Sequence, residues 1–362
     1  VVAHESGIGT VEGQTVRAPG TLRAFPAVHA DQGPGIAPAV EEQDGLVPPL
    51  EIIPHGFQGM LSDKIAVLGF IQGSNCMDRI IHQVNAILEN NITLTEQWTP
   101  IARESYAPYQ GTFDGNKKSI SELQISSTST KPQGFFGVLG SGATVKNLTV
   151  KGNISSSYYA GGIAGYIDGA TIEYCINEIN ITNNSAGKHT GGIAGYISST
   201  QSPITGCVNF GAITGIDYVG GILGGSYTTN GATVDKCINL GAITTVEGGT
   251  GYSGGIYGYP ATTNDIITNC LNLGSISSPT NKSAGIAWNN GVNMVIRYCL
   301  SVGDMTNTPE DRQPLAYWIQ TADDSLNYYD SEKISSTSSS IEGTGRSTSD
   351  LKVANAWDTS WT

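Results

Sequence analysis

The chain has 362 residues, and its 18 Lys and Arg against 31 Asp and Glu give a net charge of −13. This balance argues against a nucleic-acid partner and against adhesion to an anionic membrane, because both need a basic surface. Only 14% of the residues are charged, 47 are glycine and 39% are hydrophobic, which excludes helix bundles, coiled coils and wholly disordered chains.

Residues 1–62 differ in composition from the rest of the chain. They are rich in proline, and apolar residues such as Leu22, Phe25, Ile52 and Ile53 are scattered among them. We therefore expect an extended arm or a small separate β unit. Its apolar side chains need a cover, either in this protein or in a neighbouring copy.

Residues 63–90 are predicted to form an N-terminal cap that contains a short helix at about 78–88. The spacing of the apolar residues in this stretch is helical, and Asn75 or Asp78 could cap the first turn. A cap is expected because the end of a stacked β structure otherwise exposes unpaired backbone groups. The apolar residues with this spacing are Ile80, Ile81, Val84, Ile87 and Leu88.

A repeat of about 30 residues occupies residues 91–325. One line of it, of the form Cys-Ile-Asn-Leu-Gly-Ala-Ile, starts at Cys175, Cys207, Cys237, Cys270 and, more loosely, Cys299. A second line, Gly-Gly-Ile-Ala-Gly, returns four times from Gly161. Each period has three short segments with alternating Ile or Val, the pattern of strands rather than helices. We therefore predict an all-β parallel β-helix with three strands per coil.

This fold predicts columns of equivalent residues on successive coils. The Cys, Cys+2 and Cys+6 positions alternate in a strand and should share the inner face. The predicted columns are Cys175, Cys207, Cys237, Cys270 and Cys299; Asn177, Asn209, Asn239 and Asn272, whose amides could bond from coil to coil; and Ile181, Ile213, Ile243 and Ile276.

The cysteine column permits three interpretations. Zinc sites need short spacings such as Cys-x₂-Cys, which this chain lacks. Disulfides between stacked cysteines are disfavoured, because the coil spacing of ~4.8 Å exceeds the ~3.8 Å between Cβ atoms that a disulfide prefers. We therefore interpret the cysteines as small buried apolar residues. Cys76 lies outside the repeat, and its redox state is open.

Three motifs resemble a known family. Trp98-Thr99-Pro100-Ile101 is followed by Gly111-Thr112-Phe113-Asp114-Gly115-Asn116 and then by the glycine-rich repeats, and the tail carries Trp357-Asp358-Thr359-Ser360-Trp361. Together they resemble bacterial surface proteins with GLUG-type repeats, over about residues 85–362. The resemblance implies a right-handed parallel β-helix, an adhesin-like role and a closing C-terminal segment, which we place at 326–362.

The repeat offers one weak catalytic candidate. Glu173 and Asp235 each lie two residues before a cysteine, but the coil between them has Thr205 there, so they should stand about 10 Å apart. Such a pair could serve a polysaccharide lyase or hydrolase. The alternative is that both are solvated outward side chains. We expect no cofactor and no metal.

Tyrosines gather around the Gly-Gly-Ile-Ala-Gly line. Tyr166 and Tyr196 hold the same repeat position, so they should stack on one face, either as a recognition surface or as simple stabilising packing. No apolar run is long enough to span a bilayer. The chain begins at Val1 without a signal peptide and is rich in Ser, Thr and Asn, which fits a processed, exported protein.

The sequence therefore predicts a non-enzymatic extracellular structural or adhesive protein. Its expected partners are surface glycans, host proteins or further copies of itself, joined into a filament through the N-terminal arm. The alternative is a polysaccharide-active or glycan-binding β-helix.

Overall fold

The computed structural model describes residues 50–51, 83, 85–186, 188–198, 202–227, 231–249, 251–260, 264–278, 282–288, 294–306, 312–316, 326–334 and 343–352. The chain divides into two compact units, Val1–Leu46 and Val47–Thr362, and all described residues belong to the second. The predicted arm at 1–62 therefore lies outside the described residues, apart from residues 50–51.

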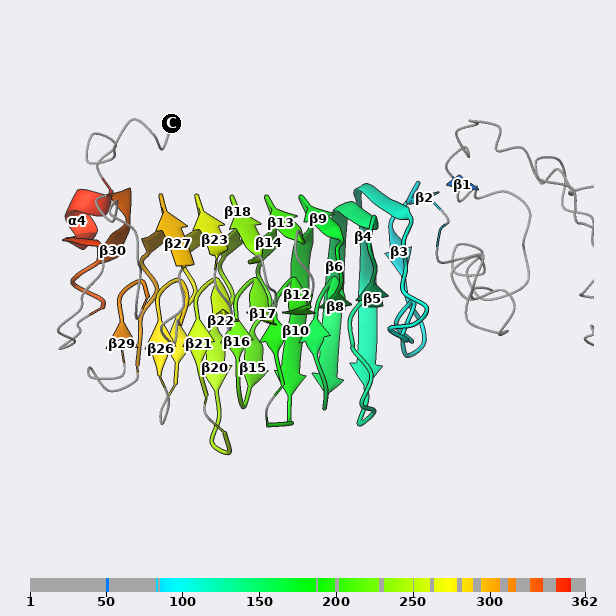
Figure 1. The fold of residues 1–362 in the computed structure, drawn as a ribbon, viewed down its shortest axis with the longest axis horizontal. Helices are drawn as coiled ribbons and strands as arrows, with labels where there is room; N and C mark the ends of the chain where they lie inside the picture. The colour runs from blue at the N-terminus through cyan, green and yellow to red at the C-terminus, as the bar shows by residue number, and fades with distance from the viewer. Residues whose placement is uncertain are drawn as a thin grey trace, which may run out of the picture. The chain divides into compact units, whose positions relative to one another are not determined.

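The second unit is a β-solenoid of about seven turns with roughly 29 residues per turn, as predicted. Figure 1 shows its strands lying side by side from β2 to β30 and α4. All strand pairs within the sheets are parallel, and they form three sheets along the solenoid. The β-branched residues of the repeat favour these buried parallel strands, and the short turns between them connect one strand to the next.

The two smaller sheets contain the glycine-rich line of the repeat. One has six strands: β7 (Ala160–Gly161), β11 (Thr190–Gly191), β16 (Val219–Gly220), β21 (Ser253–Gly254), β26 (Ser283–Ala284) and β29 (Arg312–Gln313). The other has five: β5 (Phe136–Leu139), β8 (Ala164–Ile167), β12 (Ala194–Ile197), β17 (Leu223–Ser226) and β22 (Tyr257–Pro260).

The largest sheet has 20 strands and contains the cysteine line. It consists of β1 (Leu50–Glu51), β2 (Ala86–Ile87), β3 (Ile92–Thr93), β4 (Thr112–Ser126), β6 (Thr144–Ser156), β9 (Thr171–Glu173), β10 (Ile176–Asn183), β13 (Pro203–Thr205), β14 (Val208–Asn209), β15 (Ile213–Gly215), β18 (Thr233–Asp235), β19 (Ile238–Asn239), β20 (Ile243–Thr245), β23 (Asp265–Thr268), β24 (Leu271–Asn272), β25 (Ile276–Ser277), β27 (Met294–Arg297), β28 (Leu300–Ser301), β30 (Tyr328–Asp330) and β31 (Thr344–Arg346).

The register confirms the predicted isoleucine column. Ile181 pairs with Ile213, which pairs with Ile243, which pairs with Ile276. These four side chains are at most 1% exposed and form part of the apolar interior. Successive coils thus bury the same position at the same depth, which is what a constant repeat requires.

The asparagine column forms the predicted ladder of side-chain amides. Nδ2 of Asn177 donates to Oδ1 of Asn209 at 2.7 Å, and the bonds from Asn209 to Asn239 and from Asn239 to Asn272 measure 2.8 and 2.9 Å. Each of these amides also donates to a carbonyl two residues ahead in its own chain turn, as Asn239 does to Gly241 at 3.0 Å. The ladder therefore satisfies polar atoms that are completely buried.

The five cysteines of the repeat are buried and free, so the interpretation as small buried residues is confirmed. Each sulfur contacts backbone carbonyls, and neighbouring thiols of the column also interact with each other without a covalent bond. Sγ of Cys237, for example, lies 3.5 Å from the carbonyl oxygen of Ile204 and 3.3 Å from that of Asp235. Burial raises the pKa of the Cys207, Cys237 and Cys270 thiols, which keeps them protonated.

An aromatic cluster fills the first coils. Trp98 stacks on Phe135 with ring centroids 5.1 Å apart, and its Nε1 donates to the Phe135 carbonyl at 2.9 Å. Phe113 and Phe136 pack edge to face beside them. The two motifs that precede the glycine-rich repeats thus supply the core of the N-terminal coils.

The predicted helix at 78–88 is wrong in its last turn. Ala86–Ile87 form strand β2, which pairs in parallel with Phe113 and Asp114 of β4. The open edge of β4 offers backbone hydrogen bonds, and these outweigh the helical spacing of a short apolar segment. Of the preceding part, 78–82 and 84 lie outside the described residues.

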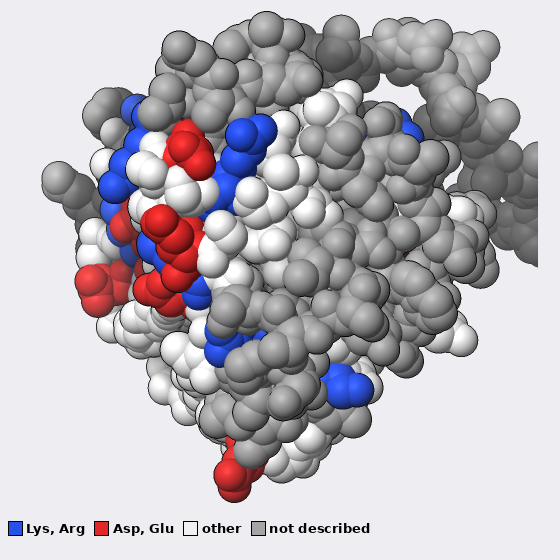
Figure 2. All heavy atoms as spheres, turned by 90° about the vertical axis from the view of Figure 1, so that its left-hand side faces the viewer, with Lys and Arg blue, Asp and Glu red and all other residues white. Residues whose placement is uncertain are grey.

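The opposite end is closed by β30, β31 and the four-residue helix α4 (Thr348–Leu351). The Oγ of Ser347 caps α4 by accepting a bond from the backbone N–H of Asp350 at 3.1 Å. Figure 2 views the molecule from this side and shows Lys, Arg, Asp and Glu side chains gathered on one part of it. A polar terminal coil of this kind shields the stacked strands beneath it.

Candidate functional site

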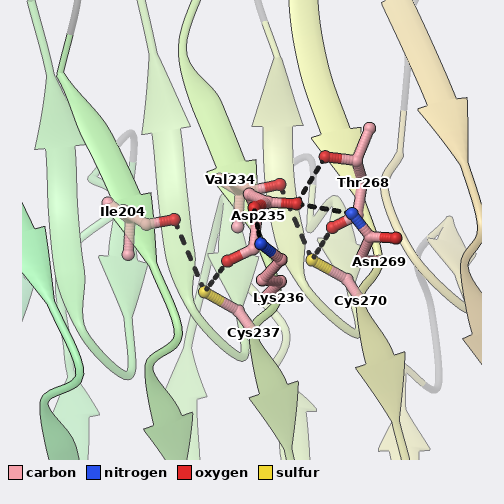
Figure 3. A network of polar contacts seen from close by, with 8 residues as sticks. All are labelled: Ile204, Val234, Asp235, Lys236, Cys237, Thr268, Asn269 and Cys270. Carbon is pink, nitrogen blue, oxygen red and sulfur yellow. Dashed lines mark hydrogen bonds and ion pairs between the residues drawn. The ribbon is translucent and has the colours of Figure 1, made fainter. Parts of the chain in front are cut away.

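Asp235 lies at a corner of the solenoid in a network of structural bonds. Its Oδ1 accepts hydrogen bonds from Oγ1 of Thr268 and Nδ2 of Asn269, both at 2.7 Å. Figure 3 shows the carboxylate pointing toward these two residues of the next coil, with Lys236 beside it. Lys236 Nζ lies 3.6 Å from Oδ2, but the lysine side chain is 66% exposed, so this ion pair adds little.

Glu173 stands two coils away from Asp235, as predicted. Thr205 of β13 pairs with Glu173 on one side and with Asp235 on the other. The two carboxylates are therefore separated by a full strand, at about 10 Å. The structure does not bring Glu173 and Asp235 together into a pair that shares one substrate atom.

An equivalent arrangement occurs at Asp114, so the same Asp–Asn contact is found at two corners of the solenoid. Oδ1 of Asp114 accepts from Nδ2 of Asn147 on the next coil at 3.0 Å. Asn147 and Asn269 occupy the same left-handed corner position, each with a φ of 54°, and in both cases the side-chain amide donates to a carboxylate of the preceding coil. At Asp114 burial opposes ionisation, but hydrogen bonds from Asn147 and Asn116 and the charge of Lys146 outweigh it and lower the carboxyl pKa.

Tyr166 and Tyr196 lie next to each other on one face, as predicted, but their rings are tilted by 39° and not stacked, and they belong to a longer aromatic row. They are in register, and their ring centroids lie 5.7 Å apart. Tyr159 stacks on Tyr196 at 4.7 Å, and the contacts continue to Trp288, whose ring lies 5.8 Å from that of Tyr252. The row consists of Tyr158, Tyr159, Tyr166, His189, Tyr196, Tyr218, Tyr252, Tyr259 and Trp288.

His189 is a member of the row that sequence reasoning missed. Gly225 holds the register position of Tyr196 and Tyr259, and a Cβ there would collide with the His189 ring. His189 thus fills the place of the missing tyrosine and stacks on Tyr218 at 4.5 Å. Burial, with a smaller contribution from Lys188, lowers the pKa of His189 to about 3, so the imidazole is neutral. The signal in the sequence was the glycine at a tyrosine position.

The rings of the row cover much of one another's faces. Lys188 covers Tyr158, with its Nζ 4.5 Å from the ring centroid, and Lys282 lies 5.8 Å from the Trp288 ring. Most rings of the row are half-buried, and burial with neighbouring tyrosines raises the pKa of Tyr196 to about 12. The row therefore stiffens the coils; its tyrosines keep part of each ring at the surface, whereas His189 and Trp288 are buried.

A second feature missed by sequence reasoning is a polar cluster inside the solenoid. Asp265 faces inward in a column whose other members are Ala143, Ala170, Ser202, Ala232 and Met294. Its Oδ1 accepts from the backbone N–H of Ala232 at 2.6 Å and lies 3.5 Å from Oγ of Ser226. The hydroxyl of Tyr257 is buried next to this carboxyl and interacts with it. Burial raises the pKa of Asp265 to about 7.

Among the described residues, no three His, Cys, Asp or Glu side chains gather as metal ligands. In the same part of the chain, no helix is long and apolar enough to cross a membrane.

No family model matches this chain. A stretch of 126 residues, 32% of the chain, is 28% identical to Halomucin of Haloquadratum walsbyi, but it makes up only 1% of that protein. The fold is similar to a crystal structure from Bacteroides ovatus, provisionally named an immunoglobulin A1 protease, with a TM-score of 0.54 and 19% identity. That similarity covers 78% of this chain and 88% of the other, and at this identity it concerns the fold alone.

Proposed function

We propose that this protein is a non-enzymatic extracellular scaffold of the adhesive class, which presents long rows of side chains to surface glycans or host proteins. The observation that carries the proposal is the recurrence of half-buried tyrosines on successive coils of the aromatic row, from Tyr158 to Tyr259. A ligand with repeating units can make the same contact on several coils, so weak contacts add up to useful avidity. The resemblance to GLUG-type bacterial surface proteins supports the same proposal.

The geometry of the acids supports a non-enzymatic role. A glycosidase needs two carboxylates about 5–10 Å apart with access to one bond of the substrate. Asp235 is engaged by Thr268 and Asn269, and Asp114, which stands two coils from Glu173 on its other side, is engaged by Asn147 in the same way. The carboxylate of Asp235 thus has a sufficient structural reason to be where it is.

Adhesion is tested with beads coated with the full chain and exposed to immobilised polysaccharides and extracellular-matrix proteins under flow. We expect retention on at least one surface, and at least tenfold weaker retention for the double variant Tyr166→Ala/Tyr196→Ala. Tyr106→Ala is the matched control, because Tyr106 is 83% exposed and lies outside the row. Equal retention of all three proteins would remove the aromatic row from the proposal.

The enzymatic alternative is tested on uronic-acid polymers. Release of new reducing ends or unsaturated products by the full chain, lost in both Glu173→Gln and Asp235→Asn, would overturn the non-enzymatic proposal. Inactivity of the unsubstituted protein over the same panel supports it.

A filament is the second candidate, and one observation favours it. Strand β1, which follows the apolar N-terminal residues, pairs in parallel with β2 at the first coil. The same pairing made to the first coil of another copy would be strand addition to an exposed edge. Electron microscopy of the full chain and of a variant lacking residues 1–60 tests it: filaments should form only with the arm, and filaments formed without it would contradict this candidate.

A further inference from the structure

A strip of apolar side chains runs along the outside of the largest sheet, next to the buried cysteine and asparagine columns. We call it the apolar strip. Phe210 is 52% exposed, Leu273 43% and Leu240 40%. The strip consists of Phe210, Leu240, Leu273 and Val302, three residues after Cys207, Cys237, Cys270 and Cys299, and of Val208, Ile238 and Leu271, one residue after the first three of these cysteines. Leu300, one residue after Cys299, closes the strip and is only 8% exposed.

The register places these side chains directly above one another. Val208 pairs with Ile238, which pairs with Leu271, which pairs with Leu300. The second column is tied in the same way, since the backbone N–H of Leu240 donates to the carbonyl of Asn209 at 2.8 Å, and Leu273 and Val302 repeat this bond one and two coils on. The strip is therefore a rigid array with a spacing of ~4.8 Å between rungs.

Polar residues border the strip on its sides and at one end. Asp235 and Arg297 lie on one flank, two residues before their cysteines, and Asp304 lies on the other. At the N-terminal end the column continues as a charged pair, with Lys151 Nζ 2.9 Å from Oε2 of Glu178. An apolar centre with a polar rim is the anatomy of a protein interface.

We propose that the apolar strip binds the same strip of a second copy, which makes a two-fold symmetric dimer with parallel solenoid axes. A second copy presents the same rung spacing, so apolar rungs meet apolar rungs along the whole strip. At the charged end this arrangement sets the Lys151–Glu178 pair of one copy against the same pair of the other, so that each lysine has a glutamate of the other copy one rung away. For a chain with a net charge of −13, an uncharged strip is also where two copies can approach with least repulsion.

The dimer is expected to be weak. Four apolar rungs give a strip only about 20 Å long. That is at the small end of specific interfaces, where association is transient and depends on concentration. This lateral contact is independent of the proposed adhesion and of the filament, which joins copies at the end of the solenoid.

The test is sedimentation velocity of the full chain between about 1 and 100 µM, the range in which interfaces of this size associate. The unsubstituted protein should show a concentration-dependent dimer, and Leu240→Lys should weaken it at least tenfold by placing a charge at the centre. Val246→Lys is the matched control: Val246 is 39% exposed, lies a few residues further along the same coil and is outside the strip. Circular dichroism verifies that both variants fold, and Phe210→Ala supplies a second, milder change.

Three results would overturn the proposal: a monomer at all concentrations, equal effects of Leu240→Lys and Val246→Lys, or a Phe210→Ala variant that dimerises as well as the unsubstituted protein. Binding of the monomeric chain to phosphatidylcholine vesicles, lost in Leu240→Lys, would likewise overturn it in favour of a lipid surface. Loss of dimers with retained adhesion to glycans would leave the proposed function standing.

Discussion

The buried carboxyl of Asp265 makes the stability of this solenoid depend on pH in a defined direction. Its pKa is raised to about 7 by burial, against about 3.9 in an unfolded chain. The folded state therefore binds more protons than the unfolded state between pH ~4 and ~7, and stability falls as the pH rises through that window. A difference of about three pKa units corresponds to about 4 kcal/mol of unfolding free energy.

Asp265→Asn removes this ionisation and keeps an oxygen that can accept the bond from the Ala232 N–H. We expect the variant to match the unsubstituted protein near pH 4 and to be more stable at pH 8, by up to about 4 kcal/mol. The assay is urea unfolding followed by circular dichroism across pH 4–8.5. The informative quantity is the difference between the two proteins at each pH, because other groups titrate in both.

Asp304→Asn provides the matched control, since Asp304 is an exposed acid of the same repeat. It should leave the pH profile unchanged. The reasoning would be refuted if Asp265→Asn and the unsubstituted protein kept a constant difference in stability from pH 4 to 8.5, because that would mean that Asp265 titrates alike in the folded and unfolded chains.

Three further predictions concern the ladders and the aromatic row. Asn239→Ala should cost about 3 kcal/mol of unfolding free energy, because it removes three bonds and leaves the amide of Asn209 buried without its acceptor; a loss below 1 kcal/mol by urea unfolding would contradict the ladder's role. Gly241→Ala should destabilise by more than about 2 kcal/mol, since its Cβ would overlap the backbone of the preceding coil; an unchanged melting temperature would refute this. His189→Phe should abolish a loss of stability of about 5 kcal/mol as the pH falls from ~6.5 to ~3, which acid titration of both proteins measures.

The periodic part of the structure could be predicted from the sequence because the repeat is a direct record of the coil. Cys207, Asn209 and Ile213 alternate along one strand, and any fold that buries one of them buries all three on the same face. The same alternation turns Val208 and Phe210 outward, so the apolar strip was already implied. Apolar residues at these outward positions are indistinguishable by type from core residues, so only the alternation assigns them to the outer face.

The non-periodic features were harder to predict, since they depend on contacts between different columns. Ser226, Tyr257 and Asp265 each look like an irregular copy of their own column, and only the folded coil shows that they surround one point. The position of the His189 ring depends on Gly225 of the following coil, where the absence of a side chain leaves room for the imidazole. At Ala86 and Ile87 the open edge of β4 outweighed local helical spacing, and the propensity of a short segment cannot reveal such an edge.

The two unusual ionisable groups act in opposite directions, which has a consequence for the whole solenoid. Between pH ~4 and ~6.5 the neutral His189 makes the fold less stable as the pH falls, whereas the protonated Asp265 makes it more stable. Their slopes nearly cancel, so these two groups together should add no net slope to the stability profile over this range. Each single variant exposes the slope of the other group, and the double variant His189→Phe/Asp265→Asn should have the same slope as the unsubstituted protein. Because one group stacks in the outer row and the other lies inside, the two effects should add; a double variant with the slope of either single variant would show instead that the sites are coupled.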